Sequence, residues 1–266
     1  MTANSKLQLL LRVLGRDPVE FYDRVRTVLE VRFEHWRIEP SRLAPADQTD
    51  ALRRLEEEFA TSIGPILQEK PLREVEENVS KRFGQLNHDR PFQLFHNGDS
   101  VLARTCYVAC RILQPDVVLE TGVAYGVTSA FLLQALQVNQ KGKLFSIDLP
   151  PLGRNGDLYV GALIPDELKD RWQLFRGPTR RLMPQLLPRL ERVDMFVHDS
   201  LHTYRNMKRE FEQVWPQLKP GGVLIADDVE GNRAFEEFSE TVRPILSVML
   251  AEGNKNSLFG LMVKKQ

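Results

Sequence analysis

The stretch DVVLETGVAYGVT, residues 116–128, decides the fold of this chain. It begins with a short β-branched run that is typical of a buried strand. A turn containing Gly122 and Gly126 follows, and then an apolar helical segment, SAFLLQALQ, at 129–137. Strand, glycine turn and helix in this order form the first unit of a parallel α/β sheet. We therefore expect an α/β domain that starts near residue 116.

The same unit repeats towards the C-terminus. Further strands are predicted at four short apolar runs: 143–148 (KLFSID), 172–175 (WQLF), 193–198 (VDMFVH) and 221–227 (GGVLIAD). Helices are predicted between them, at 204–218 and 235–242 among others. The last two runs, ILSVML and SLFGLMV, flank the turn EGNKN and predict an antiparallel hairpin. The predicted fold class is α/β, with a mostly parallel sheet that ends in a C-terminal antiparallel hairpin.

The residues before 115 have a helical pattern instead. Asp17 and Pro18 are typical of an N-cap followed by the first helical position, and apolar residues then recur at helical spacing as far as Phe33. Further helices are predicted at 50–59, 72–83 and 100–113. Because residues 1–97 concentrate no chemical signature, we expect a helical lid or oligomerisation region there, with the α/β domain at 98–266. A homodimer through apolar stripes on these helices stays open.

Composition excludes several classes of protein. The 266 residues carry 36 Lys and Arg against 36 Asp and Glu, so the formal net charge is zero, which argues against a nucleic-acid partner. No apolar run approaches the roughly 20 residues that a membrane span needs. The first residues lack the pattern of a signal peptide, so we expect a cytoplasmic protein. Cys106 and Cys110, four apart on a predicted helix, are expected to be buried thiols.

Acidic residues occur where the predicted strands end, and ligands of open α/β sheets bind at that edge. Gly122 and Gly126 allow a tight turn after the first strand and a close backbone approach to a ligand. Asp148 ends the second strand, where a carboxylate can accept hydrogen bonds from both hydroxyls of a ribose. Together these positions predict a site for an adenosine-containing cofactor.

A second acidic group follows the fourth and fifth strands. Asp199 ends the fourth strand, and the pair Asp227 and Asp228 ends the fifth. Three neighbouring carboxylates repel one another unless a cation or hydrogen-bond donors compensate, and oxygen ligands suit Mg²⁺. His202, three residues after Asp199, can accept a proton from an alcohol in its neutral form. We expect His198, inside the strand, to be a core residue.

With these residues in view, the chain resembles the class I S-adenosylmethionine-dependent methyltransferases, whose fold is a Rossmann-like seven-stranded sheet with a terminal hairpin. The stretch HDSLHTYRNMKREFEQVWPQLKPGGVLIADDV, 198–229, is most similar to metal-dependent O-methyltransferases that act on small molecules and sugars. The resemblance implies that Asp199, Asp227 and Asp228 bind the metal and that His202, with Asp199, is catalytic. It implies cofactor binding by Glu120, Thr121, Gly122, Ala124, Gly126, Ser129, Asp148 and Asp199.

Two positions depart from the pattern of this family. Pro178 stands where relatives often have an acid that helps to hold the adenine, so backbone amides and apolar contacts are expected to replace it. Ala124 stands where many relatives have a second glycine in the loop. Neither change removes a group that methyl transfer needs.

The predicted function is therefore a Mg²⁺-assisted O-methyltransferase that uses S-adenosyl-L-methionine and acts on a hydroxyl of a small polyhydroxylated or glycosylated molecule. The Gly- and Pro-rich loop 149–166 is expected to be a mobile lid beside the cofactor. The alternatives are a metal-independent methyltransferase of the same fold and a non-catalytic binding module. The glycine spacing and the acidic cluster disfavour an NAD-dependent dehydrogenase, and the absence of an Asn/Asp-Pro-Pro-aromatic turn after the fourth strand disfavours an N-methyltransferase.

Overall fold

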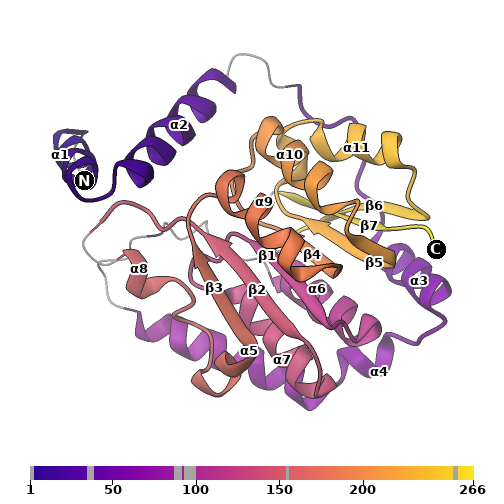
Figure 1. Ribbon diagram of the computed structural model, residues 1–266. Coiled ribbons are helices and arrows are strands. Elements are labelled where there is room, and N and C mark those ends of the chain that lie inside the picture. The colour runs from indigo at the N-terminus through magenta and orange to yellow at the C-terminus, as the bar shows by residue number, and fades with distance from the viewer. Residues whose placement is uncertain (1–2, 35–38, 87–91, 93–99, 154–155, 254–256) are drawn as a thin grey trace.

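A seven-stranded sheet forms the centre of the molecule, with the strand order β3-β2-β1-β4-β5-β7-β6 (Figure 1). The computed structural model describes residues 3–34, 39–86, 92, 100–153, 156–253 and 257–266. The strands are β1 (Val117–Thr121), β2 (Lys143–Asp148), β3 (Trp172–Arg176), β4 (Val193–His198), β5 (Leu218–Ala226), β6 (Leu246–Ala251) and β7 (Leu258–Val263). β1 to β5 are parallel, and β7 is antiparallel to both β5 and β6.

Helices precede the sheet in sequence and connect its strands. The α-helices are α1 (Ala3–Arg16), α2 (Pro18–Glu34), α3 (Gln48–Phe59), α4 (Gly64–Leu67), α5 (Lys70–Gln85), α6 (Ser100–Leu113), α7 (Val127–Asn139), α8 (Gly156–Tyr159), α9 (Thr179–Leu190), α10 (Tyr204–Val214) and α11 (Ala234–Val242). Short 3₁₀ turns are η2 (Asp166–Arg171) and η3 (Val229–Gly231).

These elements confirm the predicted α/β class, including the closing antiparallel hairpin. The bounds of β2 and β4 agree with the predicted strands to the residue, and so do those of α6. β5 begins three residues earlier than expected and ends at Ala226, so Asp227 follows the strand. Residues 254–256 of the expected EGNKN turn lie outside the described residues.

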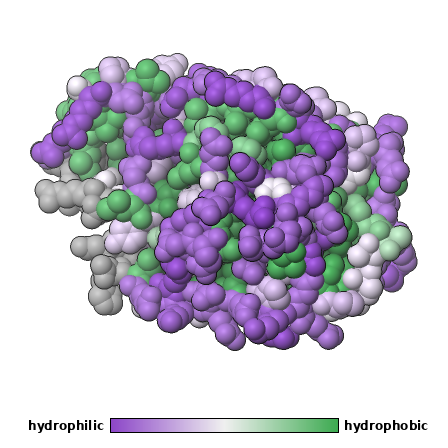
Figure 2. All heavy atoms as spheres, turned by 60° about the horizontal axis from the view of Figure 1, so that its bottom comes forward, coloured by the Kyte–Doolittle hydropathy of each residue, from purple (hydrophilic) through white to green (hydrophobic). Residues whose placement is uncertain are grey.

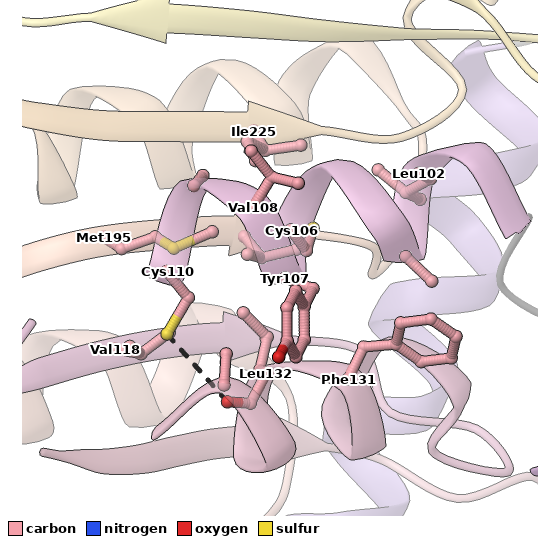
Figure 3. Packing of buried hydrophobic residues seen from close by; sticks show 14 of the residues in the cluster. Leu102, Cys106, Tyr107, Val108, Cys110, Val118, Phe131, Leu132, Met195 and Ile225 are labelled. Carbon is pink, nitrogen blue, oxygen red and sulfur yellow. Dashed lines mark hydrogen bonds between the residues drawn. The ribbon is translucent and has the colours of Figure 1, made fainter. Parts of the chain in front are cut away.

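The two faces of the sheet are covered by different helices. Buried residues of α3, α5, α6 and α7 share one apolar cluster with the sheet, and those of α9, α10 and α11 share the other. Figure 3 shows the first cluster around α6, where Cys106 and Cys110 point into the core. The Sγ atom of Cys110 lies 3.9 Å from the carbonyl oxygen of Leu132. Both cysteines are free and buried, as predicted.

The helices before residue 97 do not form one structural unit. Leu55, Leu72 and Val75, from α3 and α5, are part of the core that covers the sheet. By contrast, α1 and α2 stand at the outer edge of the molecule (Figure 1). The expected boundary between 97 and 98 lies outside the described residues, so the division of the chain there stays a prediction.

α2 packs on the body through charged residues, while its apolar residues face outwards. Asp17 caps the helix as predicted, because its Oδ1 accepts a hydrogen bond from the backbone N–H of Glu20 at 2.9 Å. The buried residues of α2 are Glu20, Asp23 and Arg24. Outside, Phe33 is 67% exposed and Tyr22 is 60% exposed. The periodicity therefore predicted the helix, although its apolar side does not face the core.

None of the described helices is both long enough and apolar enough to cross a bilayer. On the face shown in Figure 2, hydrophilic residues predominate and hydrophobic ones form separate patches.

Candidate active site

Strand register aligns the predicted site residues along one edge of the sheet. Thr121 pairs with both Ile147 and His198, and His198 pairs with Ala226. Backbone hydrogen bonds continue just beyond the strands. The N–H of Asp199 donates to the carbonyl of Thr121 at 2.7 Å, and the N–H of Asp227 donates to the carbonyl of His198 at 2.8 Å. The chain leaves β1 between β2 and β4, which is the switch point where open α/β sheets bind ligands.

The loop after β1 is built for close backbone approach. Gly122 has a φ of 82°, and a Cβ atom there would lie 1.8 Å from the carbonyl oxygen of Asp199. Ala124 also adopts a left-handed φ, 47°, which explains why glycine would be easier at this position. The Oδ2 atom of Asp148 accepts hydrogen bonds from the N–H groups of Val123 (2.7 Å) and Ala124 (2.9 Å). Asp148 thus fixes the loop and still has a second carboxylate oxygen for a ligand.

Four residues expected to bind the cofactor lie behind the cavity wall. Glu120 is fully buried, and its Oε2 accepts hydrogen bonds from the hydroxyls of Ser129 and Ser146, each at 2.7 Å. Thr121 donates to Glu210 Oε2 at 2.6 Å. Gly126 is the N-cap of α7. Of the expected set, Gly122, Ala124, Asp148 and Asp199 line the cavity.

The acidic cluster at the ends of β4 and β5 surrounds His202. The Nδ1 atom of His202 lies 2.8 Å from Asp228 Oδ2, and its Nε2 atom lies 3.6 Å from Asp199 Oδ1. Burial alone would lower the pKa of His202, but its contacts with Asp199 and Asp228 raise it to about 10. Burial and the charge of Asp199 raise the pKa of Asp227 to about 7. The imidazole is therefore protonated at neutral pH when only these side chains surround it.

Part of this cluster fits a divalent cation. Ligand atoms of Asp199, His202 and Asp227 lie within 4.8 Å of one another. Among the described residues, none forms a hydrogen bond with the buried Oδ1 atom of Asp227. Leaving a buried carboxylate oxygen unpaired costs free energy, which a bound cation would offset. The carboxylate oxygens suit Mg²⁺, whereas imidazole is a ligand more typical of Zn²⁺ or Fe²⁺. Asp228, expected as a third carboxylate ligand, contacts His202, and its role as a metal ligand stays a prediction.

A buried hydrogen-bond network supports the floor of the cavity. Glu210, on α10, accepts hydrogen bonds at 2.9 Å from the hydroxyl of Ser200 and the amide of Asn206. It also contacts His198 Nδ1 at 2.7 Å, and this contact, acting against burial, holds the pKa of Glu210 at about 2. His198 is fully buried, as expected for a core residue. Sequence analysis missed Asn206 and Glu210, although their spacing of four on an amphipathic helix was a usable signal.

One cavity of about 520 Å³ connects these features. Its wall includes residues from α2, α9 and α10 that the sequence did not indicate: Thr27, Glu30, Thr179, Arg180, Asn206 and Arg209. No local motif marks Thr27 and Glu30, because they reach the cavity only when α2 folds back over the carboxyl ends of the strands. The N-terminal region therefore contributes to the same cavity as the glycine loop.

Comparisons with known proteins agree with this architecture. A family model described as a methyltransferase domain matches residues 119–229. The solved O-methyltransferase from Bacillus cereus in complex with SAH is similar, with 15% identity and a TM-score of 0.55, over 81% of this chain and 97% of that one. The O-methyltransferase TomG from Streptomyces achromogenes, solved with SAM and involved in tomaymycin synthesis, shares 16% identity at a TM-score of 0.54, over 83% and 100% of the two chains.

The SAH-bound methyltransferase PaMTH1 from Podospora anserina is similar at 14% identity and a TM-score of 0.51, over 85% of this chain and 100% of that one. A search of curated protein sequences finds no match. At these identities the likeness to solved structures is one of fold. The chain has the fold of the class I S-adenosylmethionine-dependent methyltransferases, and its residues 119–229 form a methyltransferase domain, as the sequence predicted.

Proposed function

We propose that this protein transfers a methyl group from S-adenosyl-L-methionine to a hydroxyl of a small molecule, with assistance from Mg²⁺. The observation that carries the proposal is the single cavity that joins the Asp148-capped glycine loop to the cluster around His202. Two of the similar structures, solved with SAH and with SAM, are O-methyltransferases in name, which supports both the cofactor and the hydroxyl acceptor. The acceptor is a small, polyhydroxylated or glycosylated molecule in this proposal.

Asp148 would hold the ribose through its second carboxylate oxygen, while the backbone at Gly122 and Ala124 faces the rest of the cofactor. Asp228 orients the imidazole of His202 through Nδ1, so that Nε2 is the atom that accepts the proton of the acceptor hydroxyl. Asp199 and Asp227 would hold the cation, and Asp228 as a further ligand stays a prediction. When bound, a divalent cation lowers the pKa of a coordinated hydroxyl and, through its charge, that of a nearby imidazolium.

Calorimetric titration with S-adenosylhomocysteine tests the cofactor assignment. We expect micromolar binding by the wild-type protein and at least a tenfold loss in Asp148→Ala, because the variant loses both the ribose acceptor and the cap of the loop. Asp166→Ala is the matched control, since this carboxylate is 77% exposed and lies outside the cavity. Binding by neither wild type nor control, in Mg²⁺ or in EDTA, would refute the proposal.

The cation site is tested separately with Mn²⁺. The electron paramagnetic resonance signal of the unbound ion disappears when the ion binds to the protein. We expect Asp227→Asn to weaken Mn²⁺ binding and to leave affinity for S-adenosylhomocysteine nearly unchanged. Equal Mn²⁺ binding by both proteins would remove Asp227 from the ligand set.

A metal-independent methyltransferase is the second candidate. The observation that favours it is that His202 and Asp199 face each other, with Nε2 of the imidazole 3.6 Å from Oδ1 of the carboxylate. Asp199 and His202 would then suffice for base catalysis at a pH high enough for the imidazole to be neutral. Methyl transfer that persists after exhaustive chelation would select this version.

We also propose that the protein forms a homodimer through α2. Val19, Tyr22, Leu29 and Phe33 are exposed and, with Arg26, follow the 3-4-3-4 spacing of a coiled-coil seam. The neighbouring helix α1 also carries exposed apolar residues, with Leu11 at 55% and Leu14 at 41% exposure. We propose a second copy of the same stripe as the partner.

The free, buried cysteines fit the proposed cytoplasmic location.

A further inference from the structure

Glu30 of α2 is a carboxylate in the cavity wall that the mechanism above does not use. Its side chain is 9% exposed and is held from two directions. Its Oε2 accepts a hydrogen bond from Arg180 Nη1 at 3.0 Å, and its Oε1 accepts one from the hydroxyl of Thr203 at 3.1 Å. Arg209 Nη1 lies 3.8 Å from Oε1. These contacts fix the carboxylate in one orientation.

Glu30 lies where α9 and α10 begin, beyond the ends of β3 and β4, because it contacts Arg180 of α9 and Thr203, the N-cap of α10. The reacting sulfur must face Asp199 and Asp227, which follow β4 and β5. If Asp148 of β2 holds the ribose, the base extends to the other side, towards the end of β3. There the N–H of Gly177 bonds to the carbonyl of Asp148 at 2.8 Å, and α9 begins with residues that line the cavity.

The side chains that surround the Glu30 carboxylate are hydrogen-bond donors: Arg180, Thr203 and, at 3.8 Å, Arg209. Arg180 and Arg209 are donors only. The amide nitrogen of Asn206 already donates to Ser200 and Glu210, and its oxygen accepts from Thr179 and Arg209. Among the described residues that line the cavity, the carboxylates are Glu30, Asp148, Asp199, Asp227 and Asp228. Glu30 is therefore the carboxylate that remains for the base, and its two oxygens have capacity beyond their present bonds.

We propose that Glu30 accepts a hydrogen bond from the exocyclic amino group of the cofactor's adenine and so selects adenine over a 6-oxopurine. The inference rests on the proposed function. A 6-oxopurine presents a carbonyl oxygen at the same position, which would face the buried carboxylate without a proton between them. A buried acceptor left unpaired in this way discriminates strongly between two ligands of almost equal shape. The N-terminal helix is then part of the cofactor site.

The test compares the affinities of S-adenosylhomocysteine and S-inosylhomocysteine in the full-length protein, by calorimetry. We expect the wild type to prefer the adenine compound at least tenfold. Glu30→Gln should lower that preference to about one, because a side-chain amide can rotate to donate to the carbonyl or to accept from the amine.

Glu20→Gln is the matched control on the same helix. Glu20 forms an ion pair with Arg176 at 2.6 Å but does not line the cavity. If α2 only clamps the site mechanically, both variants weaken both ligands in proportion and leave the preference unchanged, which would overturn the inference. A wild type that binds both ligands equally would overturn it too. Failure of the wild type to bind S-adenosylhomocysteine at all would instead refute the proposed function.

Discussion

Glu120 shows how one residue can serve the site without touching it. Its carboxylate joins three elements, because it lies on β1 and accepts hydrogen bonds from Ser129 on α7 and Ser146 on β2. Ser146 also accepts a hydrogen bond from the indole of Trp172 at 2.9 Å, which extends the link to β3. Burial raises the pKa of Glu120 to about 8, against the opposing effect of the two serine hydrogen bonds. At neutral pH this side chain is protonated in the folded protein.

Protonation of Glu120 makes stability depend on pH. The folded protein keeps this proton between pH 4.5 and about 8, whereas the unfolded chain releases it, so the contribution to the free energy of unfolding falls as the pH rises through that window. The full loss is on the order of 5 kcal/mol. Urea unfolding of the wild type and of Glu120→Gln at several pH values measures this loss. The glutamine amide stays neutral, so the variant lacks the pH-dependent contribution of Glu120 to the free energy of unfolding.

We expect the stability difference between Glu120→Gln and the wild type to shift in favour of the variant as the pH increases. Parallel pH profiles of the two proteins would show that Glu120 ionises normally in the fold.

Side-chain direction explains which site residues the sequence could and could not predict. Asp148, Asp199 and Asp227 are placed by strand ends, which apolar runs indicate well. Glu120 precedes the same turn, but its side chain points into the core towards serines that are distant in sequence. Glu30 reaches the cavity only through tertiary folding of α2, and no periodicity in its own helix indicates that.

At the scale of elements, the loop between β2 and β3 combines fixed and exposed segments. The N–H of Gly161 bonds to the carbonyl of Ala124 at 3.0 Å, and that of Leu163 bonds to Tyr125 at 2.9 Å. Leu149 lines the cavity, whereas Leu158 on α8 is 78% exposed. The loop is thus anchored to the glycine turn at one end and contributes to the cavity wall at the other.

We expect cofactor binding to order this loop. Limited chymotrypsin digestion should cut after Leu158, which is 78% exposed, in the free protein and several-fold more slowly with S-adenosylhomocysteine bound, because the ligand contacts the cavity side of the loop. Cleavage after Leu43, which is 42% exposed and does not line the cavity, serves as the internal control. Equal cleavage after Leu158 in both states would count against a lid.

Repeated local signals explain why the elements of the α/β domain were predicted closely. Each strand is a short β-branched or aromatic run bounded by turn residues, and β2 and β4 therefore have the expected bounds. The helix α6 also has the expected bounds. The helices predicted at 50–59 and 72–83 correspond to α3 and α5, but α4 and the assignment of these helices to a face of the sheet were not predicted. That assignment depends on packing between residues such as Leu55 and the sheet, which a single-element pattern does not encode.

At the scale of the whole molecule, the stripe on α2 predicts an oligomer. The wild type should have twice the chain mass of 30.6 kDa in solution. A double variant, Tyr22→Glu with Phe33→Glu, should be monomeric, because the paired stripes would bury four carboxylates. Light scattering after size-exclusion chromatography measures both.

Ile245→Glu is the control for the dimer, since Ile245 is 49% exposed and lies outside α1 and α2. A monomeric wild type at concentrations of about 100 μM, or a dimer unaffected by the double variant, would exclude this interface.

The charged contact face of α2 makes two parts of the molecule respond to salt in opposite directions. The helix is tied down by Arg176 to Glu20, Arg181 to Asp23 and Arg180 to Glu30, at 2.6 to 3.0 Å. High salt weakens such attractions, although less at these largely buried carboxylates than at exposed pairs, whereas sulfate strengthens apolar burial in the sheet and its covering helices. Crystals grown from concentrated ammonium sulfate would therefore favour a loosened α2 over a well-ordered body, and crystals from low-salt polyethylene glycol would favour the closed arrangement.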